Sequence, residues 1–253
     1  MRRFFLQQND NRTNYINKIL QEMGENTLDF EPNLDKITKK DIVIVTPAFK
    51  WTEEIAKKIP RGTTVFGGMY KDAKDYIEQL DYHNFMLDED FVLKNATYTA
   101  EGFLVDLIKN TKMSLFEQKI LILGSGRVSK AVQYILYRLS VPFDVAMRNE
   151  KELNLAKLLT KRAVNIKDLK EVIKNYDTII NTIPFEIFED YIKDDFKSDV
   201  VIFELASKKC LDVNNLPDIN YVFCPSIPSK YLGDSAGKLM LQFVLDALKL
   251  KFN

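Results

Sequence analysis

Short apolar runs alternate with amphipathic stretches through the first third of the chain. The runs have the length and composition of β-strands, and they cover residues 4–7, 27–30, 41–46, 63–66 and 84–87. Between them, apolar residues recur at helical spacing, which predicts helices over residues 15–23, 52–59 and 71–80. Thr52 is placed to cap the second of these helices. This alternation predicts a small α/β unit with a parallel sheet.

The rest of the chain repeats the alternation after one joining helix. That helix is predicted over residues 99–112, with Thr99 as its cap and Glu101 in its first turn. Five strands separated by helices are expected next, at residues 119–123, 143–147, 177–181, 199–205 and 221–224. Such a series is typical of a doubly wound, nucleotide-binding sheet of the Rossmann type. The expected segments are an N-terminal lobe (1–98), a connecting helix (99–113), a Rossmann lobe (114–235) and an amphipathic C-terminal helix (236–253).

The stretch "KILILGSGRVSKAVQYIL" at 119–136 carries a glycine turn between a strand and a helix. Gly124 permits the tight turn, and Gly126 lets the backbone approach a pyrophosphate at the start of the helix. Ser129 lies where a third glycine is usual, and serine is small enough to keep the helix close to the strand. The predicted phosphate-binding residues are Gly124, Ser125, Gly126, Arg127 and Val128.

The following strand ends at Arg148 and Asn149, without the acidic residue that is usual in NAD sites. An arginine there suits the 2′-phosphate of NADP, and Asn149 is expected to hydrogen-bond the same group; an exposed loop arginine is the alternative. We therefore predict NADP as the cofactor, with NAD as the second possibility. Two later strand ends are expected to line the same crevice through Thr182, Ile183, Pro184, Leu205 and Ala206.

Composition narrows the class of protein. The chain has 253 residues with 36 basic and 36 acidic side chains, so it offers no electrostatic reason to bind nucleic acid or an anionic membrane surface. No apolar stretch approaches the length of a membrane span, and no signal peptide is recognisable. Cys210 and Cys224 are too few for a disulfide framework or a cysteine-rich zinc site, so we expect reduced thiols, no metal and a cytoplasmic location. The one histidine, His83, is expected to be structural.

Five segments together resemble a known family. They are "YTAEGFL", "ILGSGRVSKAV", "IINTIPFEIF", "VIFELAS" and "CPSIPSKYLGDSAG", in this order. The chain is similar over nearly its whole length to the A subunit of bacterial dipicolinate synthase. It departs from that family at Ser129, where glycine is usual, and at 233–235, where Pro-Lys-Thr is usual. The first lobe is short for the family and only weakly similar to it.

The resemblance implies a fold and an activity. The fold is a flavodoxin-like lobe followed by a Rossmann lobe, with the last helix packing back toward the first lobe. The activity is the oxidation of a dihydrodipicolinate-type dicarboxylate with NADP during sporulation. The implied partner is a second, flavoprotein-like subunit. Association between copies of this chain is a separate expectation.

A dicarboxylate substrate needs cationic or N–H partners. Lys50 and Lys230 are the cationic candidates, and Glu101 is either a base or a residue that stabilises the helix dipole. These three form the expected catalytic set. The residues expected to add hydrogen bonds to the substrate are Thr46, Thr99, Ser226 and Ser229.

Two alternatives stay open and one is excluded. "IVTPAFK" at 44–50 is similar to a stretch of shikimate dehydrogenases in which the lysine is catalytic, although the spacing is one residue shorter. A non-catalytic nucleotide-binding subunit is the second alternative. The acid–base histidine of 2-hydroxy-acid dehydrogenases has no counterpart in the second lobe, which excludes that chemistry.

Overall fold

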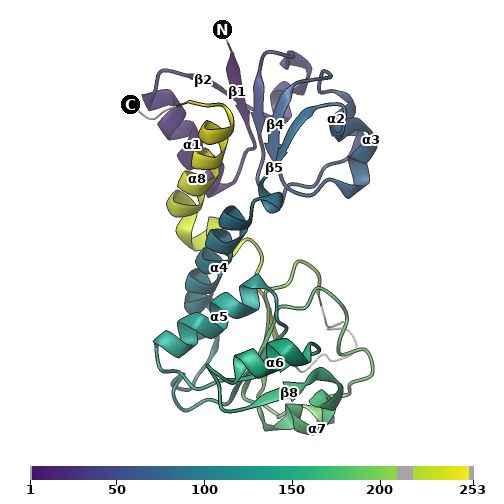
Figure 1. The fold of residues 1–253 in the computed structure, drawn as a ribbon, viewed down its shortest axis with the longest axis vertical. Helices are drawn as coiled ribbons and strands as arrows, with labels where there is room; N and C mark the ends of the chain where they lie inside the picture. The colour runs from purple at the N-terminus through teal and green to yellow at the C-terminus, as the bar shows by residue number, and fades with distance from the viewer. Residues whose placement is uncertain (1, 210–218, 251–253) are drawn as a thin grey trace. The chain divides into compact units, whose positions relative to one another are not determined.

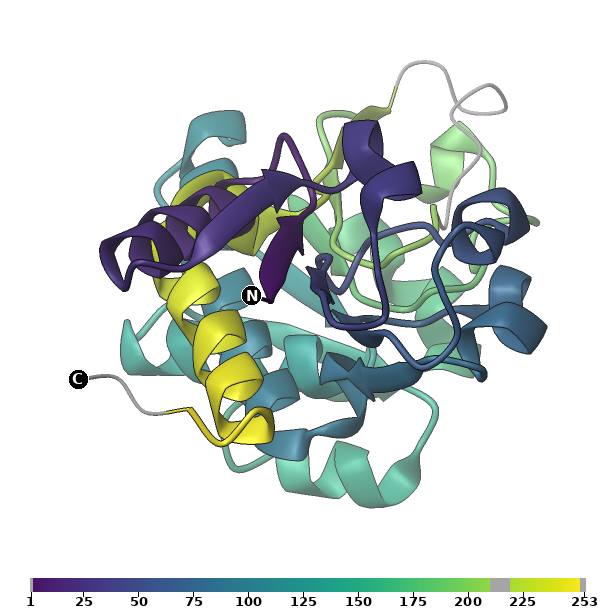
Figure 2. The same ribbon diagram turned by 90° about the horizontal axis from the view of Figure 1, so that it is seen from above.

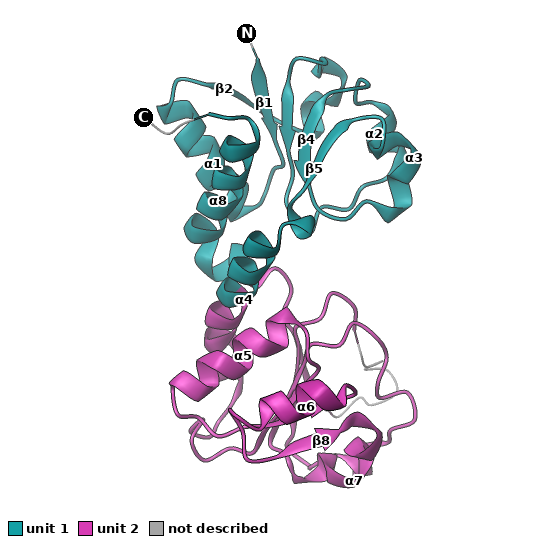
Figure 3. Ribbon diagram, viewed as in Figure 1, with its two compact units in different colours: residues 1–98, 228–253 teal, residues 99–227 magenta. Residues whose placement is uncertain are grey.

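The computed structural model describes residues 2–209 and 219–250, which fold into two compact units (Figure 3). Unit 1 comprises residues 1–98 and 228–253, and unit 2 comprises residues 99–227. The chain therefore returns to unit 1 after completing unit 2. The C-terminal segment belongs to the first unit from residue 228, eight residues before the boundary expected from the sequence.

Unit 1 is built on a five-stranded parallel sheet with the order β2-β1-β3-β4-β5. Its strands are β1 (Arg3–Leu6), β2 (Asn26–Asp29), β3 (Ile42–Ile44), β4 (Thr64–Gly67) and β5 (Asp81–Asn84). Its helices are α1 (Asn11–Glu22), α2 (Glu53–Lys57), α3 (Lys74–Ile77) and α8 (Ile227–Ala247), with short 3-10 turns at Glu31–Lys36, Lys71–Ala73 and Phe85–Leu87. This order confirms the expected flavodoxin-like lobe. The direction of winding reverses between β1 and β3, which makes that point the topological switch of the sheet.

The two faces of this sheet have separate cores. Phe4 and Leu6 pack with residues of α1 and α8, whereas Phe5, which points to the other face, packs with residues of α2 and α3. Helices α1 and α8 lie side by side in both views (Figures 1 and 2). A Cβ atom on Gly237 would lie 2.6 Å from the Arg12 carbonyl oxygen, so the two backbones approach closely. The last helix thus packs on the first, as expected.

Unit 2 is built on a six-stranded parallel sheet with the order β11-β10-β9-β6-β7-β8. Its strands are β6 (Ile120–Leu123), β7 (Asp144–Met147), β8 (Ala163–Asn165), β9 (Thr178–Asn181), β10 (Val201–Glu204) and β11 (Asn220–Phe223). Its helices are α5 (Arg127–Arg138), α6 (Glu150–Ala156) and α7 (Leu169–Val172), with 3-10 turns at Ile166–Asp168, Ile173–Asn175 and Lys193–Asp195. Numbered within the unit, the order is the 3-2-1-4-5-6 of a Rossmann fold.

Three local expectations are wrong. The strand expected at 84–87 lies earlier, at Asp81–Asn84, because the Asn84 side chain accepts from Met86 N at 2.9 Å and starts a 3-10 turn. Strand β8 is absent from the expected series, because its three residues are only half-buried and lack a strong apolar pattern. The joining helix α4 (Glu89–Asn110) begins ten residues before Thr99. It starts there because Asp88 accepts from Phe91 N at 2.7 Å.

Two further findings bear on the expected class of protein. Within residues 2–209 and 219–250, no helix is long and apolar enough to cross a membrane. Cys224 is buried in unit 2, and Cys210 lies outside the described residues.

Candidate functional site

Strand β6 ends at a glycine with a conformation that other residues rarely adopt. Gly124 has a φ of 109°, and a Cβ atom added there would lie 2.5 Å from the Thr182 Oγ1 atom. The positive φ and the close contact together exclude a side chain. The tight turn from β6 into α5 therefore depends on glycine at this position.

Gly126 leaves space at the start of α5. It is exposed, and a Cβ atom added there would meet no described atom within 4 Å. Among the described residues, no side chain caps α5, and its first turn contains no acidic residue. The first N–H groups and the positive end of the helix dipole are therefore available to an anion. These features fit the pyrophosphate of a dinucleotide.

Ser129, at the position of the usual third glycine, is fully buried. Its Oγ atom donates to the Gly124 carbonyl oxygen at 2.7 Å and accepts from Gln133 Nε2 at 2.9 Å. The hydroxyl thus ties the first turn of α5 to the glycine turn that precedes it. Serine supplies a hydrogen bond where glycine would supply only close packing.

A buried carboxylate joins the ends of β9 and β10. Glu204 is fully buried and accepts from Asn181 Nδ2 at 2.8 and 3.1 Å, from Ala206 N at 2.9 Å and from the Tyr221 hydroxyl at 3.2 Å. The Asn181 amide also bonds both backbone polar groups of Ile183 at 3.0 Å. One network therefore fixes the turns after both strands. Glu204 is not among the residues expected from the sequence, although an acidic residue inside the apolar run "VIFELAS" was the available signal.

The turn after β9 is also fastened to β6. The Thr182 hydroxyl donates to the Leu123 carbonyl oxygen at 2.7 Å, and Thr182 N donates to the same atom at 3.1 Å. Thr182 is only partly buried, and Pro184 is exposed beside it. The side chain of Thr182 is thus used within the protein, and the backbone of the turn faces the carboxyl edge of the sheet.

Arg148 and Asn149 follow β7 at the same edge and have different roles. Asn149 caps α6, because its Oδ1 atom accepts from Glu152 N at 3.2 Å. Arg148 is exposed, and its guanidinium has no hydrogen bond or ion pair to any residue in the described ranges. Arg148 is therefore the side chain at this strand end that is available to a ligand.

All the predicted cofactor residues follow the carboxyl ends of four strands of one sheet. The ends of β6, β7, β9 and β10 carry them, and β6 and β9 are neighbours on either side of the switch point of unit 2. Ligands of open α/β sheets bind at such an edge. The remaining members of the predicted set are Ser125, Arg127, Val128 and Leu205.

The residues expected to serve catalysis or bind substrate are divided between the units. Unit 1 contains Thr46, Lys50, Ser229 and Lys230, and unit 2 contains Thr99, Glu101 and Ser226.

The helix start expected at Thr99 is wrong. Thr99 lies inside α4 and is buried, so it begins no helix and offers no free N–H group. Glu101 is likewise far from the first turn and is exposed, so it does not stabilise the helix dipole there. The first turn of α4 instead contains Glu89 and Asp90.

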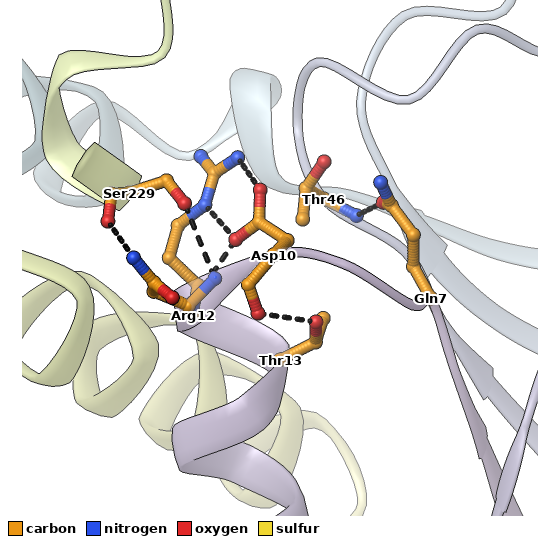
Figure 4. A network of polar contacts seen from close by, with 7 residues as sticks. Gln7, Asp10, Arg12, Thr13, Thr46 and Ser229 are labelled. Atoms are coloured by element: carbon orange, nitrogen blue, oxygen red, sulfur yellow. Dashed lines mark hydrogen bonds and ion pairs between the residues drawn. The ribbon is translucent and has the colours of Figure 1, made fainter.

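Ser229 fastens α8 to α1. Its Oγ atom accepts from Asn11 N at 3.3 Å, and its carbonyl oxygen accepts from Asn11 Nδ2 at 2.9 Å (Figure 4). Ser226, just before α8, is exposed and has a φ of 50°. Lys230 is exposed, and its Nζ atom lies 4.6 Å from the centre of the Tyr231 ring. Lys50 is exposed after β3.

The carboxyl edge of the unit 1 sheet carries a polar network in which Gln7, Asp10 and Arg12 were not predicted from the sequence (Figure 4). Thr46, just after β3, is 1% exposed, and its N–H group donates to Gln7 Oε1 at 2.8 Å. Asp10 caps α1 and binds the Arg12 guanidinium through two hydrogen bonds, Nε to Oδ1 at 2.8 Å and Nη2 to Oδ2 at 2.7 Å. Burial opposes ionisation of Asp10, but the hydrogen bonds and charge of Arg12 leave its pKa below the ordinary value.

Comparison with known proteins agrees with this architecture. No protein-family model matches the chain. The chain is 23% identical over 155 residues to the A subunit of dipicolinate synthase from Bacillus subtilis (strain 168), covering 60% of this chain and 52% of that protein. It is 29% identical over 161 residues to the NADP shikimate dehydrogenase of Methanosphaera stadtmanae, covering 59% of this chain and 54% of that protein. The chain thus spans about half the length of the curated relatives that it matches.

Solved structures extend the likeness to the whole fold. The A subunit of dipicolinate synthase from Bacillus halodurans has a TM-score of 0.83 at 17% identity, with 97% of this chain and 98% of that chain covered. D-lactate dehydrogenase of Escherichia coli has a TM-score of 0.68 at 11% identity, with 99% and 98% covered. The two resemblances inferred from the motifs are therefore confirmed. This chain has a two-unit, dehydrogenase-type fold and is similar to the dipicolinate synthase A subunit and, more weakly, to shikimate dehydrogenase.

Proposed function

We propose that the chain is an NAD(P)-dependent oxidoreductase that holds its dinucleotide at the carboxyl edge of unit 2. The observation that carries the proposal is the turn from β6 into α5. Gly124 is required there by its backbone, Gly126 leaves open space, and the helix has no side-chain cap among the described residues. A glycine turn of this form, in a sheet with Rossmann order, is suited to a pyrophosphate.

Each strand end contributes a different part of the site. The backbone N–H groups at the start of α5 receive the pyrophosphate, and Arg148 pairs with a 2′-phosphate, which favours NADP. The turns at 182–184 and 205–206 line the nicotinamide half of the crevice. Their shape is maintained by Glu204, whose hydrogen bonds hold both turns.

The proposed reaction is the oxidation of a dihydrodipicolinate-type dicarboxylate to dipicolinate in sporulating cells, together with a second synthase subunit. The similarity to the A subunit of dipicolinate synthase supports this substrate. A bound oxidised nicotinamide supplies the hydride acceptor. The substrate loses one hydride and one proton, and its ring becomes aromatic. Because aromaticity drives the loss of the proton, the chain needs only to orient the ring and let the proton pass to solvent or to an exposed base such as Glu101.

A shikimate-dehydrogenase-like reaction is the second candidate. The relative that is 29% identical supports it. Lys50 follows β3 at the carboxyl edge of unit 1 and is exposed, so it is accessible to a substrate. Lys50→Ala separates the two candidates, because shikimate oxidation depends on this lysine and dipicolinate formation does not.

Calorimetric titration of the full chain with NADP and with NAD tests the cofactor. We expect NADP to bind more tightly, and binding of neither dinucleotide would overturn the proposal. Turnover is then followed by the absorbance of reduced nicotinamide, with dihydrodipicolinate or shikimate as substrate and with or without the second synthase subunit. Tight NADP binding without turnover of either substrate would instead indicate a non-catalytic nucleotide-binding subunit.

A further inference from the structure

The carboxyl edge of unit 1 between β1 and β3 brings together three side chains with unused hydrogen-bond donors. Gln7 follows β1, Thr46 follows β3, and Arg12 lies in the first turn of α1. These positions surround the topological switch point of the sheet, where open α/β sheets bind ligands. All three belong to unit 1, so the arrangement is independent of unit 2.

Thr46 and Gln7 orient each other. The Thr46 N–H group donates to Gln7 Oε1 at 2.8 Å, which fixes the carboxamide with its Nε2 donor directed elsewhere. Neither Gln7 Nε2 nor the Thr46 hydroxyl is hydrogen-bonded to any other residue that the structure describes. Thr46 is 1% exposed, but its Oγ1 atom is not among the fully buried, unpartnered side-chain atoms of the described residues, so the hydroxyl can be reached from solvent.

Arg12 presents a second, unused edge. Arg12 is 4% exposed, and Asp10 occupies the Nε–Nη2 edge of its guanidinium. Within the described ranges, no acceptor lies on its Nη1–Nη2 edge. Figure 4 shows the guanidinium, the Thr46 hydroxyl and the Gln7 amide turned to the same side, away from α1. Asp10 thus fixes the orientation of the Arg12 guanidinium and leaves its Nη1–Nη2 edge without a partner among the described residues.

The unused groups share one chemical property. All are donors, so the group that satisfies them must present acceptor oxygens. A planar carboxylate matches the end of a guanidinium fork and can accept from the neighbouring hydroxyl and amide as well. We propose that this edge of unit 1 binds a carboxylate group of the substrate, with Arg12, Thr46 and Gln7 as the donors. The identity of that substrate as a pyridine-type dicarboxylate rests on the proposed function.

This assignment replaces the lysines expected from the sequence. Lys50 and Lys230 are both exposed, and the Lys230 ammonium lies over the Tyr231 ring. An exposed lysine is a mobile point charge, whereas Arg12 is buried and oriented by its carboxylate partner. A preorganised donor recognises the shape of a carboxylate as well as its charge.

Calorimetry with three probes tests the proposal on the full chain saturated with NADP. The probes are pyridine-2,6-dicarboxylate, pyridine-2-carboxylate and pyridine. We expect the dicarboxylate to bind more tightly than the monocarboxylate, and pyridine to bind too weakly to measure. Thr46→Val removes one hydroxyl and should raise the Kd about tenfold, and Gln7→Glu, which keeps the acceptor for Thr46 N, should raise it about a hundredfold.

Matched variants at the opposite edge of the same sheet separate binding from stability. Arg12→Lys should weaken binding of the dicarboxylate because lysine lacks the planar fork, and Arg3→Lys is its control, since Arg3 also pairs with a buried aspartate through two hydrogen bonds. Thr63 is fully buried and donates to the Pro60 carbonyl oxygen, so Thr63→Val is the control for Thr46→Val. We expect both controls to lower the melting temperature and to leave the Kd of the dicarboxylate unchanged.

The outcomes distinguish this inference from the proposed function. Unchanged affinity in Thr46→Val and Gln7→Glu overturns the inference, as does a wild-type chain that binds NADP but none of the carboxylates. If NADP does not bind, the titrations are repeated without it. Carboxylate binding that still depends on Thr46 and Gln7 would then support this site while the proposed function fails.

Discussion

The two units present different surfaces at the carboxyl edges of their sheets. In unit 2, the side chains of Ser129, Thr182 and Glu204 form hydrogen bonds within the protein, so the edge consists mainly of backbone turns and an uncapped helix start. In unit 1, Gln7 and Arg12 keep side-chain donors that form no hydrogen bond to any described residue. The difference indicates that unit 2 recognises phosphate through main-chain N–H groups, and that unit 1 recognises a carboxylate through side chains.

The largest expected effects come from the two glycines of the turn between β6 and α5, Gly124 and Gly126. Gly124→Ala places a Cβ atom 2.5 Å from Thr182 Oγ1 at a positive φ, so we expect a loss of about 3 kcal/mol in the free energy of unfolding and no NADP binding. Gly126→Ala meets no described atom, so its stability should stay within about 0.5 kcal/mol while the Kd for NADP rises at least about tenfold. Urea unfolding and calorimetry measure both effects. Wild-type NADP affinity in Gly126→Ala would show that the phosphate lies elsewhere.

A second test asks whether buried hydrogen bonds shape the cofactor turns. Glu204→Gln places a donor against Asn181 Nδ2 or Ala206 N, so we expect a loss of roughly 2 to 3 kcal/mol in stability and about a tenfold rise in the Kd for NADP. Thr178→Val is the control, because Thr178 donates to Gln118 Oε1 at 2.6 Å at the amino end of β9, the strand whose other end carries Asn181. The control should lose stability and keep its NADP affinity. Equal losses of affinity in both variants would contradict a positioning role for Glu204.

The ion pair between Arg3 and Asp41, at the amino edge of the unit 1 sheet, predicts a pH dependence of stability. It lies at the opposite edge from the proposed carboxylate site. Burial opposes ionisation of Asp41, but hydrogen bonds from Arg3 and Thr38 lower its pKa to about 2. Because this is below the value in the unfolded chain, the stabilisation is present above about pH 4 and is lost as the pH falls toward about 2.

We expect Asp41 to contribute about 2 kcal/mol to the free energy of unfolding at neutral pH. Urea unfolding between pH 7 and pH 2 should show this part of the pH dependence in the wild type and not in Asp41→Asn. An identical pH dependence in the two proteins would contradict the assignment.

The smallest expected effect concerns the choice between dinucleotides. Arg148→Ala should raise the Kd for NADP about tenfold and leave the Kd for NAD unchanged, because only NADP carries the 2′-phosphate. Because Arg148 is exposed, the free energy of unfolding should change by no more than about 0.5 kcal/mol. A parallel change for both dinucleotides would show that Arg148 contacts a group that they share.

Features that depend on local sequence were predictable, and features that depend on tertiary contacts were not. The turn at Gly124 was predictable because a positive φ and a close contact with the Thr182 side chain require glycine, which is visible in the sequence. The parallel sheets were predictable from apolar runs, but β8 was not, since its residues are half-buried. The start of α4 differs from the prediction because two residues suit a helix cap, and the fold uses Asp88 rather than Thr99.

The carboxylate site of unit 1 was predicted only in part, because Thr46 was expected to bind substrate and Gln7 and Arg12 were not. Gln7, Arg12 and Thr46 are separated along the chain and meet only because β1 and β3 are neighbours in the folded sheet. Gln7 and Arg12 each look like an ordinary polar residue in their own segments. Their significance depends on which hydrogen bonds the fold uses and which it leaves open, and the positions of tertiary contacts decide this.

Amide hydrogen exchange of the full chain with two ligands tests the contrast between the edges most directly. NADP should slow exchange in peptides that contain residues 124–128 and 182–184, and pyridine-2,6-dicarboxylate should slow it in peptides that contain residues 7–13 and 45–47. Protection of the unit 1 loops by NADP, or protection by the dicarboxylate that excludes residues 7–13 and 45–47, would contradict the assignment of phosphate to one edge and carboxylate to the other.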